Sequence, residues 1–289
     1  MAPVSSFVSE SARQRYRLIY DAALATLPPH HSRDVSTDFG SIRALELGTG
    51  PGLPVVLLHG MSCTSAMWGP NLEALAADRR VIALDSVVDA GGSTQTAAVA
   101  DLADVTRSVA QALDGLGVRK AHVVGLSYGA WTAAGLALHE RDLVASVSVL
   151  EPAMTIHRIK LDYLRGFLAS FVRKPPRRWD FLFHRRPADE LIALLDSSRS
   201  FRPRAPLPGV FSDEQLAAID VPMQVILGEN STTCDASRTS SRLAAPAPLA
   251  SIHVVPGAGH IVNVDQPAAV NALLRDFLGA MDHTTEGSG

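Results

Sequence analysis

The chain has 289 residues, 47% of them hydrophobic, and a formal charge of −3. This size and apolar content suffice for one large buried core, and a charge so near zero does not favour nucleic acid as a partner. The two cysteines, Cys63 and Cys234, are too few for a disulfide framework.

The two ends of the chain carry few signals. The first residues lack a basic stretch followed by an apolar stretch, so they do not resemble a signal peptide. No apolar run approaches the roughly 20 residues that a membrane span needs. We therefore expect a soluble, cytoplasmic protein with no membrane span and with a disordered tail at residues 282–289. Nothing in the sequence predicts the oligomeric state.

The pattern along the chain predicts an α/β fold. The first 50 residues favour an N-terminal helix and an antiparallel edge hairpin. Amphipathic helical patterns then alternate with six apolar runs typical of buried strands: residues 54–60, 80–85, 121–125, 144–150, 221–228 and 251–257. This alternation predicts a mostly parallel central sheet flanked by helices.

The alternation stops between residues 152 and 219, where helical patterns continue without a strand-like run. This stretch holds six of the nine phenylalanines. We interpret it as a helical cap inserted after strand 6 (144–150), over the strand ends where open α/β sheets bind ligands. The predicted core is then 1–151 and 220–281. The alternative is a helical subdomain whose aromatic side chains form only its own core.

The pentapeptide GLSYG, residues 125–129, follows one predicted strand and opens a helix. G-x-S-x-G in this context is typical of a nucleophile on a strained strand-to-helix turn. The flanking glycines are needed because a Cβ there would collide with neighbouring backbone. We predict Ser127 as the nucleophile, with the N–H of Tyr128 free at the helix N-terminus.

Two further loops complete the predicted chemistry. HGMS ends the strand at 54–60, so the N–H of Met61 is a second oxyanion donor beside that of Tyr128. His59 then holds the loop and is not the base. PGAGHIVNVDQP follows the last strand, and its glycine-rich loop lets His260 reach Ser127 as general base.

With these pieces, the chain resembles the alpha/beta-hydrolase superfamily over nearly its whole length. HGMS, DSVVDAGGS, GLSYGAW, LGENSTTCD and VPGAGHIVNVDQP carry the resemblance. They look most like a bacterial subgroup of small intracellular serine hydrolases. The resemblance implies the chain order nucleophile, acid, base, and an acid three residues after the glycine that ends the strand at 221–228. That position is Ser231, which has no carboxylate.

Either the acid comes from elsewhere in the chain, or the site has no acid at all. Some family members place it at the end of the strand before the cap, which here puts Glu151 beside the strand of the nucleophile. We predict that Glu151 orients His260 as the third member of the triad. Asp235, later in the same loop as Ser231, is the alternative. Glu151 could instead cap a helix or pair with an arginine of the cap.

The substrate pocket is less well defined by the sequence. Trp68, after the oxyanion loop, and Phe167, in the cap, are candidate pocket residues, with core packing as the alternative for both. Between Arg158 and Arg204 the cap has twelve basic and five acidic residues. This charge favours an anionic or carrier-bound acyl substrate, or it marks a solvated face. No metal motif is present.

These features predict a cofactor-free serine hydrolase that acts on an ester, thioester or lactone of a small molecule. Two alternatives stay open. The same fold serves non-hydrolytic cyclases and lyases of specialised biosynthesis, and a residual triad can belong to a protein that only binds a small ligand.

Overall fold

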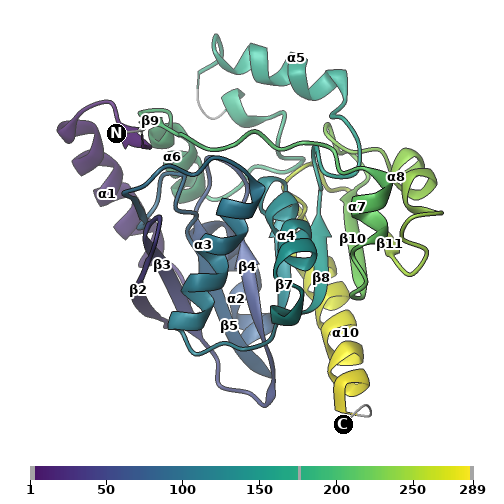
Figure 1. The fold of residues 1–289 in the computed structure, drawn as a ribbon. Helices are drawn as coiled ribbons and strands as arrows, with labels where there is room; N and C mark the ends of the chain where they lie inside the picture. Colours follow the sequence, from purple (N-terminus) through teal and green to yellow (C-terminus); the bar gives the residue numbers. More distant parts are fainter. Residues whose placement is uncertain (1–3, 175–176, 287–289) are drawn as a thin grey trace.

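The structure is a computed structural model that describes residues 4–174 and 177–286 (Figure 1). Its centre is a nine-stranded sheet in the order β11-β10-β8-β7-β4-β5-β3-β2, with β6 paired to β3. The strands are β2 (His31–Thr37), β3 (Gly40–Leu47), β4 (Gly52–Leu58), β5 (Arg79–Leu84), β6 (Thr94–Gln95), β7 (Ala121–Leu126), β8 (Val144–Leu150), β10 (Met223–Gly228) and β11 (Ser251–Val255).

The direction of these strands confirms the predicted alpha/beta-hydrolase architecture. The six runs predicted as buried strands are β4, β5, β7, β8, β10 and β11, and they pair in parallel. The N-terminal hairpin of β2 and β3 is antiparallel and forms one edge. Because the carboxyl ends of parallel strands meet at one edge of a sheet, the loops after these strands gather there.

Helices cover both faces of the sheet, and each face has its own apolar cluster. Successive side chains of a strand point to opposite faces of the sheet. In β4, Val56 and Leu58 therefore belong to one cluster and Val55 and Leu57 to the other. The first cluster includes α3 (Leu102–Gly115), α4 (Tyr128–His139) and α8 (Ala236–Leu243). The second includes α1 (Glu10–Leu24), α2 (Gly69–Ala76), α9 (Val262–Asp265) and α10 (Pro267–Glu286). η1 (Ser65–Trp68) and η2 (Arg141–Leu143) are single 3₁₀ turns.

The helical segment inserted between β8 and β10 is more closely joined to the rest than the sequence suggests. It contains α5 (Leu161–Ser170), η3 (Arg177–Trp179), α6 (Asp189–Ser198), β9 (Phe201–Arg202) and α7 (Asp213–Ala217). Strand β9 pairs with β1 (Ser6–Phe7), and α6 packs on α1. A two-residue strand is too short to leave a periodic pattern. In Figure 1, α5 stands out at the end of the molecule farthest from the lower end of α10.

The expected disorder of residues 282–289 is wrong for its first part. Helix α10 continues to Glu286, and residues 287–289 lie outside the described residues. The reason is Asp282, whose carboxylate accepts the N–H of Leu53 at 3.2 Å. It also lies 3.0 Å from the guanidinium of Arg79 and 3.0 Å from Nε2 of His122, both of which are buried. The polar composition of the tail therefore hides a tertiary contact.

Among the helices of the described residues, none combines the length and the apolar character needed to cross a bilayer.

We expect Asp282→Ala to lower the free energy of unfolding by about 2 kcal/mol, because the buried Arg79 and His122 lose a partner. Urea denaturation measures this change. Asp276→Ala, an exposed position on the same helix, is the control and should stay within about 0.5 kcal/mol. Equal denaturation midpoints for the two variants would contradict a structural role for Asp282.

Candidate active site

Ser127 stands on the turn between β7 and α4. Its φ is +54°, in the left-handed region, and its N–H donates to the carbonyl of Leu150 at 2.9 Å. A Cβ on Gly125 would come within 2.0 Å of the carbonyl oxygen of Gly129, and one on Gly129 within 2.1 Å of that of Leu58. Both glycines are therefore required by close backbone contacts. Ser127 is partly exposed, while its neighbours in the turn are buried.

The two predicted oxyanion donors come from this turn and from the loop after β4. Tyr128 is the first residue of α4, so its N–H has no acceptor inside the helix. Met61 lies in the loop after β4, and a Cβ on the preceding Gly60 would be 3.5 Å from the Cβ of Ser127. Within the described residues, neither N–H meets an acceptor.

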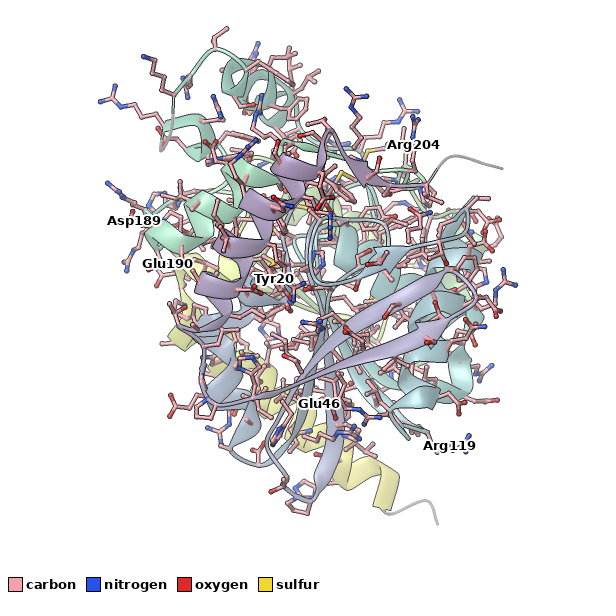
Figure 2. All side chains as sticks on the ribbon, turned by 90° about the vertical axis from the view of Figure 1, so that its left-hand side faces the viewer. Tyr20, Glu46, Arg119, Asp189, Glu190 and Arg204 are labelled. Carbon is pink, nitrogen blue, oxygen red and sulfur yellow. The ribbon has the colours of Figure 1, made fainter. Side chains whose placement is uncertain are left out.

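Carboxylates from the loop after β5 hold the loop after β4. Asp89 accepts the N–H of Ser62 at 2.5 Å, and Asp85 accepts that of Ser65 at 2.7 Å. Asp85 is fixed in turn by the hydroxyl of Tyr20, at 2.7 Å, which points inward from α1 (Figure 2). Burial raises the pKa of the Asp89 carboxyl. These contacts fix the backbone that carries the N–H of Met61.

His59 and His260 have different surroundings. Nε2 of His59 accepts the N–H of Ser86 at 2.9 Å, so this imidazole holds a loop. His260 lies between β11 and α9 and is buried, with the ring of Tyr163 edge-on at 6.0 Å between centroids. Its loop is fixed by Asp265, which accepts the N–H of Gly259 at 2.7 Å.

Glu151, and not Asp235, lies beside His260. Nδ1 of His260 is 3.1 Å from Oε2 of Glu151, the residue that follows β8 and is completely buried. Oε1 of Glu151 accepts the N–H of Gly228 at 2.7 Å. Asp235 instead caps α8, where its carboxylate accepts the N–H of Arg238 at 2.9 Å.

Ser231, at the position where the family resemblance implies an acid, contacts the carboxylate of Glu151. Its hydroxyl donates to Oε2 of Glu151. A carboxylate at position 231 would meet Glu151 directly, and two like charges in one buried site cannot both ionise. The serine is thus compatible with the acid at the end of β8.

Thr233 belongs to the same cluster, and the sequence does not predict this contact. Its Oγ1 lies 2.7 Å from Oε2 of Glu151 and 2.8 Å from Nδ1 of His260. A hydroxyl that donates to the carboxylate can accept the N–H at Nδ1, which leaves Nε2 of His260 as the acceptor that faces the reaction. A threonine in a polar loop has no sequence signal that predicts such a contact.

The two candidate pocket residues have different surroundings. Trp68 has no exposed surface and packs within the second core cluster, so its assignment to the pocket is wrong. Trp68 ends the 3₁₀ turn η1, in which Ser65 and Met67 are also buried, so this turn carries the indole inward. Phe167, on α5, is 42% exposed and stacks on Tyr163 with 6.4 Å between centroids. Tyr163 touches His260, so Phe167 is one ring away from the site.

The other reactive groups that the structure describes do not form a second catalytic or metal site. Cys234 is buried, and burial together with the charge of Glu151 raises its pKa well above the ordinary value of a thiol. The part of the chain that the structure describes contains no group of three or more His, Cys, Asp or Glu residues able to hold a metal ion.

This geometry agrees with a comparison against protein families. The model of the alpha/beta hydrolase family matches residues 55–273, about three quarters of the chain. The chain belongs to the alpha/beta hydrolase family. Ser127, Glu151, Thr233 and His260 all fall inside the matched range.

Similar hydrolases come from Bacillus subtilis (strain 168). The chain is 29% identical to the carboxylesterase nap over 92% of this chain and 93% of nap. It is 27% identical to carboxylesterase YbfK, over 94% of this chain and 96% of YbfK. The crystal structure of naproxen esterase (carboxylesterase NP) from Bacillus subtilis superposes with a TM-score of 0.86 at 26% identity, covering 94% of this chain and 99% of that one.

We expect Thr233→Val to lower kcat about 10- to 30-fold, because one hydrogen bond to the His260–Glu151 pair is lost while the side chain keeps its volume. KM should stay within about twofold, since Thr233 is buried behind the imidazole. Thr233→Ser restores the hydroxyl and should recover most of kcat. A valine variant with unchanged kcat, or a serine variant as impaired as valine, contradicts the role of Thr233 in positioning His260.

Proposed function

We propose that this protein hydrolyses carboxylic esters of small molecules through an acyl-enzyme on Ser127, without a cofactor. The observation that carries the proposal is the buried Glu151 carboxylate in contact with Nδ1 of His260, at the same sheet edge as Ser127. The carboxylesterases that the chain resembles in Bacillus subtilis give independent support for an ester as the scissile group.

The first half of the reaction forms the acyl-enzyme. Oγ of Ser127 attacks the ester carbonyl while Nε2 of His260 takes the hydroxyl proton. The N–H groups of Met61 and Tyr128 donate to the oxygen that becomes negative, each worth about 3 kcal/mol of transition-state stabilisation. Glu151 stabilises the imidazolium. When the carbon–oxygen bond of the ester breaks, His260 gives its proton to the leaving alcohol.

The second half reverses these roles. A water loses a proton to Nε2 of His260 and attacks the acyl carbon. The tetrahedral intermediate again has its oxygen on the N–H groups of Met61 and Tyr128. Collapse breaks the bond to Ser127, whose Oγ takes the proton back from His260, and the carboxylic acid is released. Acyl transfer and hydrolysis therefore use one base and one oxyanion site.

The finer identity of the substrate is part of the proposal. An ester is favoured over a thioester or lactone because of the carboxylesterases above, and an anionic acyl group is favoured by the basic inserted segment. The cytoplasmic location expected from the sequence stays a prediction. So do the division of the chain into core and cap and the role of Phe167 as a pocket residue.

We expect Ser127→Ala to abolish hydrolysis of p-nitrophenyl acetate, with turnover lower by about 10⁶, and to abolish labelling by a fluorophosphonate probe. The unmodified protein should react with both. Turnover by the variant above about a hundredth of the parent rate contradicts Ser127 as nucleophile. Labelling without hydrolysis of any ester supports a cyclase or lyase instead, and failure of both supports a binding protein.

The acid is tested by two conservative changes. We expect Glu151→Gln to lower kcat by about 10⁴, because the amide favours the wrong tautomer of His260. Asp235→Asn, which keeps an oxygen that can cap α8, should cost less than about threefold and serves as the matched control. Thermal unfolding of both variants reports whether the buried amide has disturbed the fold. The reverse order of effects would show that Asp235 is the acid.

A further inference from the structure

The outer surface of α5 and the turn after it is unusually apolar for an exposed helix. Among the described residues, thirteen large hydrophobic side chains are exposed, and six of them fall within residues 161–172. These six are Leu161, Leu164, Phe167, Leu168, Phe171 and Val172, with exposed fractions from 42% to 85%. Clustering of this kind on one short helix marks a contact surface, whereas single exposed hydrophobic residues are ordinary.

The spacing of three of the six shows that the exposed side chains are not simply the inner side of an amphipathic helix, although Phe167 stacks on Tyr163 and so lies toward that inner side. Leu161, Leu164 and Leu168 follow one another at intervals of three and four residues, so they share one face. The side that meets the site is a different one, where Tyr163 packs on His260 and on Phe181 at 5.4 Å between centroids. A helix that rests on its protein by one side needs one apolar stripe. The second face has no partner in the described part of the chain.

Basic residues flank α5 along the chain, both before and after it. Between Arg158 and Arg178 the sequence has seven basic residues and one acidic residue. The one acid, Asp162, lies 3.3 Å from Arg165 on the same helix. The guanidinium of Arg199 lies over the ring of Phe171 at 5.1 Å.

Four of the bordering cations have exposed side chains without an acidic partner in the described residues: Arg158, Arg173, Lys174 and Arg177. We call these four and the six apolar side chains the α5 surface. It combines an apolar strip with a basic border.

The shape and charge of the α5 surface decide between possible occupants. The helix protrudes at one end of the molecule (Figure 1), so a flat surface can reach its outer face. A second copy on a two-fold axis would bring identical basic borders together. Apolar side chains with a lysine and arginine border are the pattern of a helix that lies in the interface of an anionic lipid surface.

We propose that the α5 surface docks the protein on an anionic lipid surface, from which it takes amphiphilic esters. The substrate class in this statement rests on the ester hydrolysis proposed above, and the docking does not. The inner side of the same helix touches His260 through Tyr163. An ester held in the docked surface is therefore presented within one side chain of the catalytic base.

The test is binding to vesicles of ether-linked lipids, which contain no carboxylic ester and so cannot be consumed. In sedimentation assays at low salt, the unmodified protein should bind phosphatidylglycerol vesicles with at least tenfold higher affinity than vesicles of phosphatidylcholine alone. Leu164→Ser with Leu168→Ser should weaken the binding at least tenfold. Arg173→Gln with Lys174→Gln should weaken the binding about 25-fold, because each charge removed should lower the affinity about fivefold.

Matched substitutions elsewhere on the surface control for nonspecific hydrophobic binding and for the loss of positive charge. Leu18→Ser with Leu249→Ser alters two leucines that are 72% and 87% exposed but lie outside the α5 surface. Arg119→Gln removes a cation at the opposite end of the molecule (Figure 2). Both variants should bind the anionic vesicles within about twofold of the unmodified protein.

The outcomes separate the two proposals. Absence of vesicle binding, or equal loss in the control variants, overturns docking even if p-nitrophenyl acetate is hydrolysed. Conversely, vesicle binding without hydrolysis of any ester leaves docking in place and overturns the ester hydrolase. A dimer that dissociates on Leu164→Ser with Leu168→Ser, with no vesicle binding, shows that the α5 surface joins two copies and overturns the proposal.

Discussion

A carboxylate with no exposure to solvent, that of Glu151, is the group on which the arrangement of the site depends. An unpaired charge in such a place would cost several kcal/mol, so its oxygens must be satisfied by the protein. The donors are the N–H of Gly228, the hydroxyls of Ser231 and Thr233, and the imidazole of His260. They come from the end of β10, the loop after it and the loop after β11. One charge thus holds three chain segments in register.

Ser127 and Glu151 are held in place by similar backbone arrangements. Ser127 and Glu151 end neighbouring strands, and both have φ in the left-handed region, at +54° and +47°. Such conformations cost of order 1–3 kcal/mol each and persist only where surrounding contacts impose them. Here the N–H of Ser127 donates to Leu150 and that of Glu151 donates to Ile226, each at 2.9 Å. These bonds cross from β7 to β8 and from β8 to β10, so the strained residues are fixed by the sheet itself.

The sequence correctly placed residues that follow the ends of strands, while the catalytic roles of these residues stay predictions. Ser127 and His260 follow from a turn and a loop placed after buried strands, and Glu151 follows because parallel strands end at one edge. The missed parts depend on contacts between distant segments. Trp68 is core and Asp282 joins Arg79 because of packing that no local pattern encodes. Thr233 looks like any polar loop residue until its hydroxyl meets two partners.

The loop whose hydroxyls donate to Glu151 also anchors α5. Before this helix, the N–H of Lys160 donates to the carbonyl of Thr233 at 3.2 Å, and its ammonium donates to the carbonyl of Ser231 at 2.9 Å. After it, the hydroxyl of Thr232 donates to the carbonyl of Phe181 at 2.8 Å. Because these anchors lie on both sides of α5, the helix keeps its place above the site as long as the loop keeps its shape. The loop keeps its shape because two of its hydroxyls are bonded to a buried charge. The outward apolar helix and the inward carboxylate are therefore held by the same few residues.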